Sequence, residues 1–459
     1  MRRTRSSAAR KPKRDLSQGP IRGHMIRMTI PMIWGILAVI GFQLVDMYFI
    51  SLLGTRELAA ISFTFPVTYF VFAVTMGVSI ATSSVLSRLI GRGEWYKVRR
   101  IASHALILAA ALGGFFSLLG LLFQTPLFRL LGAETHSLPL IRAYMDVWFL
   151  GAVFLTLPVV GNAAIRATGS ATTPAAIMVL ATLINIIFDP LLIFGLFGFP
   201  ALGLQGAALA TVLANLVAAG VGFYVLKVKK DMIVRSSWHG KLFADSLKRL
   251  LVIAVPAGLM QALQPVANAV IIALLAQESA HAVASFGIAS RVEAFTMVIV
   301  MALSVGMGPI LGQNQGAGNG ERVSETIRKA LGFTMVWSLL TAVILALYAR
   351  PIAGLFSRDP AVIEPATLYF WIVPASYVLG NLVHVWASAF NALGASRRSF
   401  SLIFFKMIAL RIPMSIAGGL AGGPPGVFAG IALSNLVSGA GWHFANKRFV
   451  ALKIEENIL

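Results

Sequence analysis

The feature that most constrains this chain is a series of long apolar stretches that follow one another along almost its whole length. A helix that crosses a bilayer needs about 20 mostly apolar residues, and twelve such segments can be placed in the 459 residues. Only 12% of the residues are charged, whereas a soluble domain carries about 25%. This deficit argues against a water-soluble enzyme and against a nucleic-acid-binding protein.

We therefore predict an all-α polytopic membrane protein with twelve transmembrane helices, because continuous apolar runs differ from the alternating pattern of a membrane barrel. The predicted spans cover approximately residues 26–50, 58–86, 101–123, 139–160, 172–197, 203–226, 248–276, 282–311, 328–349, 364–388, 399–420 and 426–446. The segments between the spans contain turn-forming residues, as in the glycine- and proline-rich run 422–426.

Basic residues are distributed unevenly over the segments that connect the spans. The termini and the even-numbered connections hold 30 of the 38 Lys and Arg residues, and the odd-numbered connections hold five. Positive charge concentrates on the cytoplasmic side of membrane proteins, so we predict that both termini lie in the cytoplasm. The net charge of +21 is explained by this topology, and no nucleic-acid partner is expected.

The chain divides into two halves and three flanking segments. The first stretch is basic and lacks the short apolar core and cleavage site of a removed leader, so we interpret it as a disordered tail. The predicted units are a basic cytoplasmic tail (1–25), an N-lobe (26–226), a cytoplasmic linker (227–247), a C-lobe (248–446) and a cytoplasmic C-terminal tail (447–459).

The two lobes are related by an internal duplication. An offset of 225 residues brings many residues into register without gaps, among them Pro31 with Pro256, Gly91 with Gly316 and Tyr144 with Tyr369. Six spans is an even number, so both lobes enter the membrane in the same orientation. Parallel repeats of this kind suit alternating access, which favours a transporter over a channel or a receptor.

Two aspartates lie inside predicted spans without a basic residue to neutralise them. Asp46 falls about 28 Å along the first span and Asp189 about 26 Å along the fifth, which places them at similar depth. Asn185 precedes Asp189 by one helical turn and shares its face. An unpaired carboxylate in a medium of low dielectric constant must take up a proton, bind a cation or meet a positively charged substrate. We therefore predict an ion-coupling site here.

The polar residues of the second half differ from this pair. Glu293 has Arg291 close in sequence, and Lys406 and Arg411 lie in the eleventh span. We interpret these four residues as a polar network in which the acid is neutralised inside its own lobe.

The remaining polar and aromatic residues give weaker signals. Asp146 is predicted to form a structural pair with Arg142, four residues away. The glycine-rich run 312–320 lacks dinucleotide-binding spacing and is interpreted as a cytoplasmic turn. The candidates to line a cavity beside the acid pair are Gln43, Met47, Tyr69, Asn162 and Phe188.

Several kinds of chemistry are missing from the sequence. The chain has no cysteine, so thiolate zinc sites and cysteine nucleophiles are excluded. It contains neither the phosphate-binding loop of an ATPase nor a nucleophile–base constellation. We predict no enzyme activity, no metal site other than Na⁺ at Asp46 and Asp189, and no cofactor beyond the coupling ion. The energy for transport then comes from an ion gradient or a partner.

A set of motifs together resembles the multidrug and toxic-compound extrusion (MATE) family from about Met25 to Arg448. The motifs are Pro31 with Asp46 in the first span, Asn185-x-x-x-Asp189-Pro190, Gly206-Ala-Ala-Leu-Ala-Thr211, Arg291-Val-Glu293, Gly312-Gln-Asn-Gln-Gly316-Ala-Gly318 and Arg411-Ile-Pro413. The resemblance implies two six-helix bundles that form a V around a central cavity. It also implies export of cationic or amphiphilic organic compounds in exchange for H⁺ or Na⁺.

The resemblance further implies which residues form the coupling site. In prokaryotic members this site would comprise Asp46, Asn185, Asp189 and Thr211, and a hinge near Pro31 would bend the first helix on protonation. Another branch of the family places acids in the bodies of spans seven and ten, where this sequence has none. Coupling through the N-lobe is therefore favoured.

The leading hypothesis is a secondary antiporter of the cytoplasmic (inner) membrane that acts as a monomer in the lipid bilayer. Small organic cations or amphiphiles are the expected substrates. One alternative is a flippase for a lipid-linked oligosaccharide or another amphiphile, and a second is a membrane scaffold that transports nothing. The sequence leaves open the substrate, the coupling ion and the function of the basic tail.

Overall fold

The computed structural model describes residues 15–234 and 240–455, and every regular element in those ranges is helical. The first half contains α1 (Ile21–Ser51), α2 (Thr55–Gly91), α3 (Trp95–Leu130), α4 (Leu138–Leu150), α5 (Ala152–Ala167), α6 (Thr172–Phe194), η1 (Leu196–Gly198), α7 (Leu204–Tyr224) and η2 (Val225–Lys229). The second half contains α8 (Gly240–Glu278), α9 (Ala280–Gly316), α10 (Gly320–Leu347), α11 (Ala349–Phe356), α12 (Pro360–Ile372), η3 (Pro374–Ser376), α13 (Tyr377–Ala392), α14 (Ser396–Phe404), η4 (Phe405–Arg411) and α15 (Ile412–Glu455).

The helices agree with the predicted membrane spans. Within the described residues ten helical units are long and apolar enough to cross a bilayer, or eleven if α4 and α5, bent by 51°, form one span. The last unit, Ser396–Val450, has 55 residues, more than one crossing needs. It folds back at Gly422 and Gly423, whose backbone is non-helical. Divided at this hairpin, the helices correspond to the twelve predicted segments.

The N-terminal boundary of the first lobe differs from the prediction. α1 begins at Ile21, and ahead of it Leu16 is already buried against the core. Leu16 and the first turns of α1 therefore pack against the core, unlike the tail predicted for 1–25. Residues 1–14 of that predicted tail lie outside the described residues.

The linker and the C-terminal boundary are also more helical than expected. The predicted linker 227–247 begins inside η2 and ends inside α8, and its residues 235–239 lie outside the described residues. α15 continues through most of the predicted C-terminal tail, 447–459, of which residues 456–459 are not described.

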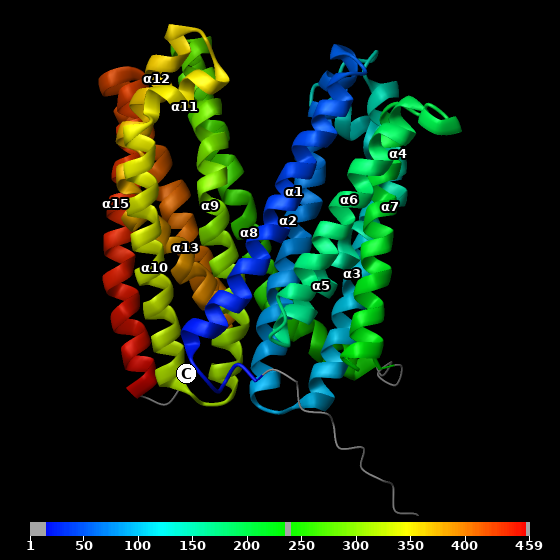
Figure 1. The fold of residues 1–459 in the computed structure, drawn as a ribbon, viewed down its shortest axis with the longest axis vertical. Helices are drawn as coiled ribbons and strands as arrows, with labels where there is room; N and C mark the ends of the chain where they lie inside the picture. The colour runs from blue at the N-terminus through cyan, green and yellow to red at the C-terminus, as the bar shows by residue number, and fades with distance from the viewer. Residues whose placement is uncertain (1–14, 235–239, 456–459) are drawn as a thin grey trace, which may run out of the picture.

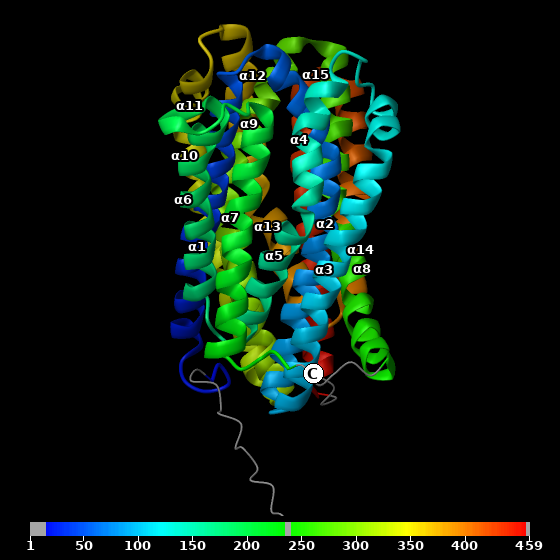
Figure 2. The ribbon, with the colours of Figure 1, turned by 90° about the vertical axis from the view of Figure 1, so that its right-hand side faces the viewer.

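The helices form two lobes, α1–α7 and α8–α15. Figure 1 shows that the lobes lie close together at the end of the molecule where α1 begins and α15 ends, and diverge toward the opposite end. We call the first of these ends the termini side. Figure 2 also shows the start of α1 and the end of α15 there. Contacts between the lobes are made by α2 with α8 and α9, and by α1 with α9.

Glycines allow α2 and α9 to approach each other on the termini side. A Cβ atom at Gly91 of α2 would lie 2.1 Å from the carbonyl oxygen of Gln313 on α9, and one at Gly316 of α9 would lie 2.1 Å from that of Arg88 on α2. The 225-residue offset maps Gly91 onto Gly316 and Arg88 onto Gln313. The two contacts are therefore one contact repeated by the duplication, and the axis that relates the lobes passes between α2 and α9.

The glycine-rich run that begins at Gly312 contributes to this contact. The prediction of a turn over 312–320 is wrong for its first part, because α9 continues as a helix to Gly316. Gly312 and Gly316 are four residues apart, the spacing by which small residues let helices in membranes pack closely. Both face α2, since a Cβ atom at Gly312 would lie 2.0 Å from Ser87 Oγ.

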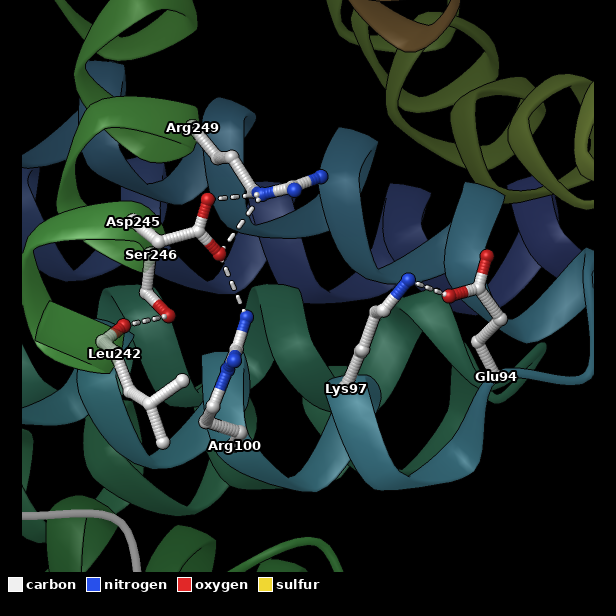
Figure 3. Close-up of polar contacts among 7 residues, drawn as sticks. All are labelled: Glu94, Lys97, Arg100, Leu242, Asp245, Ser246 and Arg249. Carbon is white, nitrogen blue, oxygen red and sulfur yellow. Dashed lines mark hydrogen bonds and ion pairs between the residues drawn. The ribbon is translucent and has the colours of Figure 1, made fainter. Parts of the chain in front are cut away.

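An ion cluster adds a second link between the lobes on the termini side (Figure 3). Asp245 of α8 accepts a hydrogen bond from Arg100 Nη2 of α3 at 2.7 Å and another from Arg249 Nε at 3.0 Å. The Arg100 side chain is only 7% exposed, whereas that of Asp245 is 40% exposed. Lys97 and Glu94 form a separate, more exposed pair near the start of α3.

Asp245→Asn is expected to weaken the link between α3 and α8. The substitution leaves the buried Arg100 guanidinium without its counter-charge, which costs more than the loss of an exposed pair. We expect the midpoint of thermal unfolding in detergent, followed by tryptophan fluorescence, to fall by about 2–4 °C. Glu94→Gln is the matched control and should leave the midpoint unchanged. Equal shifts for both variants would show that the Arg100–Asp245 pair does not link the lobes.

Candidate functional site

The two predicted acids lie on neighbouring helices of the N-lobe. Asp46 lies on α1 and Asp189 on α6, and these two helices pack along each other. Asp189 is completely buried, and Asp46 is half-buried, with an Oδ1 atom that is buried and has no hydrogen-bond partner among the described residues. The two carboxylates are close enough to interact electrostatically. The sequence prediction that both lie at one depth and face one site is consistent with this geometry.

Asn185 and Thr211 complete the site around Asp189. The side-chain amide of Asn185 lies between Thr211 of α7 and the Asp189 carboxylate. Its orientation is assigned from the hydrogen bonds it can form. With its nitrogen toward Asp189, the amide donates to the two carboxylate oxygens at 2.6 and 2.9 Å and accepts from Thr211 Oγ1 at 3.1 Å. Hydroxyl, amide and carboxylate groups from α6 and α7 thus gather in one place.

Tyr144 is a further member that the sequence reasoning did not select. It lies on α4, is 9% exposed, and interacts electrostatically with both Asp46 and Asp189. The sequence signal that could have selected Tyr144 is its match with Tyr369 across the duplication. In the structure each of these tyrosines lies near an acid of its own lobe. Tyr369 Oη donates to Glu293 Oε2 at 2.7 Å.

The acid pair has no basic partner among the residues that the structure describes. None of the ion pairs found at 4 Å or less in those residues includes Asp46 or Asp189. The two carboxylates and the Thr211 hydroxyl offer oxygen atoms, the ligands that hard cations prefer. This arrangement can hold a proton or a small cation.

Asp146 differs from its prediction. Its carboxylate accepts a hydrogen bond from the buried Gln124 amide of α3, and no ion pair with Arg142 within 4 Å is present in the described residues. Arg142 is exposed, which explains the difference, because water solvates the guanidinium. Both residues line a pocket of about 450 Å³ at the ends of α3 and α4 that does not include the acid pair.

The predicted polar network of the C-lobe is only partly assembled. Arg291 is exposed, and none of the hydrogen bonds of the described residues joins it to the other three members. Glu293 is held by Tyr369, and it interacts electrostatically with Lys406 without an ion pair at 4 Å or less in the described residues. Lys406 and Arg411 are buried, with 3% and 5% exposure.

The predicted hinge and cavity residues remain predictions. α1 runs unbroken through Pro31. Gln43 and Tyr69 are exposed, and Met47 and Phe188 are half-buried. Asn162 is buried, and its Oδ1 atom has no hydrogen-bond partner in the part of the chain that the structure describes. Such mixed burial agrees with residues near an opening between helices, but it does not place all of them around one cavity.

A comparison with protein families identifies the class to which this fold and site belong. The MatE family model matches the chain twice, over residues 31–191 and 256–417. The two matches begin 225 residues apart, which is the offset of the internal duplication. The chain belongs to the MATE family of membrane transporters. It is therefore a transporter, and neither an enzyme nor a passive scaffold.

Individual relatives cover almost the whole chain. An FAD transporter of Shewanella oneidensis is 40% identical over 438 residues, 95% of this chain and 97% of the relative. The multidrug export protein MepA of Staphylococcus aureus is 29% identical over 386 residues, 83% of each chain. The crystal structure of the Vibrio cholerae MATE transporter VcmN in the bent form superimposes with a TM-score of 0.90 at 28% identity, over 96% of this chain and 99% of that chain.

Proposed function

We propose that this protein is a secondary antiporter of the cytoplasmic membrane, with both termini in the cytoplasm, that exports an amphiphilic aromatic compound in exchange for H⁺ or Na⁺. The observation that carries the proposal is the pair of acids formed by the buried Asp189 and the half-buried Asp46, whose Oδ1 atom is buried, with no base paired to either among the described residues. Two carboxylates that interact electrostatically cannot both stay charged in a medium of low dielectric constant. A proton or a cation from water cancels that charge.

The proposed cycle uses this requirement. When the lobes open outward, the acid pair takes up the ion, and the occupied pair favours return to the inward-facing state. In that state the ion leaves to the cytoplasm and the substrate binds. Only a ligand whose affinity differs between the two states can drive such a cycle. Asn185, between Thr211 and Asp189, positions the carboxylate for the ion.

FAD or a closely related flavin nucleotide is the first proposed substrate. The support is the FAD transporter of Shewanella oneidensis, which is similar over nearly the full length of both chains. Cationic or amphiphilic drugs are the second candidate. MepA is a multidrug exporter, and an acid pair without a base also attracts organic cations.

Flux into proteoliposomes tests the proposal. Purified protein is reconstituted, and pH and Na⁺ gradients are imposed separately while uptake of FAD and of ethidium, an organic cation, is measured. We expect accumulation of one of these substrates under one of the two gradients and none without a gradient. Equal flux with and without both gradients would contradict an antiporter.

A further inference from the structure

Two buried basic side chains of the C-lobe have no function in the proposed coupling. Lys406 and Arg411 both lie on η4, a π-helical segment between α14 and α15. π-helical turns are rare and occur frequently at functional sites. Both side chains are at least nineteen-twentieths buried, with 3% and 5% exposure. A charge taken this far from water is costly unless something pairs with it.

The hydrogen-bond partners of Lys406 and Arg411 carry no negative charge. Lys406 Nζ donates to the Gly380 carbonyl oxygen at 2.8 Å and lies 3.2 Å from His384 Nε2. Among the described residues, the hydrogen-bond contact of Arg411 is from Nη1 to the Met407 thioether, at 3.9 Å, and Arg411 Nε is buried without an acceptor. In the described part of the chain no carboxylate lies within 4 Å of either cation.

The other titratable groups around the cluster include one acid among the described residues. Glu293 is the acid that acts electrostatically on Lys406, and Tyr369 donates a hydrogen bond to its Oε2 atom. Tyr377 and His384 also face the cluster, and neither brings a negative charge at neutral pH. Two basic side chains therefore face one acid, and Arg411 keeps N–H donors that have no acceptor among the described residues.

A phosphate group would supply the negative charge and the hydrogen-bond acceptors that Lys406 and Arg411 lack. A guanidinium offers a planar fork of donors that matches the oxygens of phosphate, and a neighbouring ammonium adds a point charge. Within the described residues the two lobes then differ around equivalent tyrosines: two acids without a base lie near Tyr144, and the acid near Tyr369 is outnumbered by two basic side chains. One site of each sign matches the charges of a coupling cation and an anionic nucleotide.

We propose that Lys406 and Arg411 form an anion site that binds the phosphate groups of the transported nucleotide. This inference rests on the proposed export of a flavin nucleotide and specifies how the anionic part of that substrate is recognised. The cluster is covered by its own lobe in this arrangement of the helices, so the anion reaches it when those helices move during the cycle. His384, bonded to Lys406, holds the ammonium in place.

Binding of inorganic pyrophosphate and of FAD to the purified full-length protein in nanodiscs tests the site. Isothermal titration of wild type, Arg411→Gln and Lys406→Gln is compared with Arg350→Gln, which removes an exposed arginine of the same lobe. We expect each of the first two variants to bind both ligands at least about tenfold more weakly, and the control to bind as wild type does. Arg411→Lys keeps the charge but loses the planar fork of donors, so it should bind both ligands more weakly than wild type and more tightly than Arg411→Gln. It replaces Arg411→Gln as the test variant if that variant does not fold.

The outcomes separate this inference from the proposed function. Pyrophosphate binding that is lost in Arg411→Gln supports the anion site even if FAD does not bind. In that case the proposal of a flavin substrate is wrong and the anion site stands. The anion site is overturned if wild type does not bind pyrophosphate, or if both glutamine variants bind it as tightly as wild type. FAD flux that is driven by an ion gradient in those variants would leave the antiporter intact.

Discussion

Asp189→Asn is expected to abolish ion-coupled export while the protein remains folded. The side chain is completely buried and its hydrogen-bond partner is the Asn185 amide. Asparagine keeps the volume and still accepts from that amide, so packing changes little. It can neither take up a proton nor contribute a charge to a cation. We expect efflux from cells expressing the variant to fall by about tenfold or more, close to the level of cells without the protein.

The control for this prediction is Asp146→Asn. Asp146 is an acid of the same lobe, but it bonds to Gln124 and lines a pocket away from the acid pair. Its substitution should preserve efflux, while Asp46→Asn should reproduce the loss. Full efflux by Asp189→Asn, at equal amounts of protein in the membrane, would end the coupling proposal.

The second large effect is expected for Gly91→Leu. A side chain there starts with a Cβ atom only 2.1 Å from the Gln313 carbonyl oxygen. That neighbour is backbone and cannot rotate away, so α2 and α9 must separate on the termini side. We expect this arrangement of the lobes to be lost, and transport with it, because alternating access needs both end states to be populated.

Distances between spin labels can follow this separation. The chain has no cysteine of its own, so labels can be attached at Tyr96→Cys of α3 and Glu321→Cys of α10, which are on opposite lobes. Gly91→Leu should lengthen the label distance. Gly332→Leu is the control, since Gly332 is exposed and a Cβ atom there meets nothing within 4 Å. An unchanged distance in Gly91→Leu would show that the glycine contact does not hold the lobes together.

The sequence alone predicts much of this fold because the bilayer restricts the alternatives so strongly. The apolar segments have to be helices, since lipid offers no hydrogen bonds to an unpaired backbone. An aspartate inside such a segment is conspicuous for the same reason, so Asp46 and Asp189 can be selected without a structure. The one-turn spacing of Asn185 and Asp189 also places them on one face before any tertiary contact is known.

Contacts between distant segments are harder to predict. The bond from Gln124 to Asp146 and the pair Arg100–Asp245 join residues on different helices, and no local pattern announces either. Arg142 is four residues from Asp146, but exposure to water makes that local pair unnecessary. Tyr144 could be selected from the sequence only through its match with Tyr369 in the duplication. That match does not show that either tyrosine lies near an acid.

The measurement that tests the central claim most directly reverses the exchange. Proteoliposomes without any ion gradient receive a gradient of substrate, and the movement of H⁺ and Na⁺ is followed with a pH-sensitive dye and with radioactive sodium. The account predicts that one of these ions moves against the substrate, and that the movement disappears in the double variant Asp46→Asn with Asp189→Asn. Ion movement that persists in the double variant, or substrate flux in wild type without any ion movement, would contradict coupling at the acid pair.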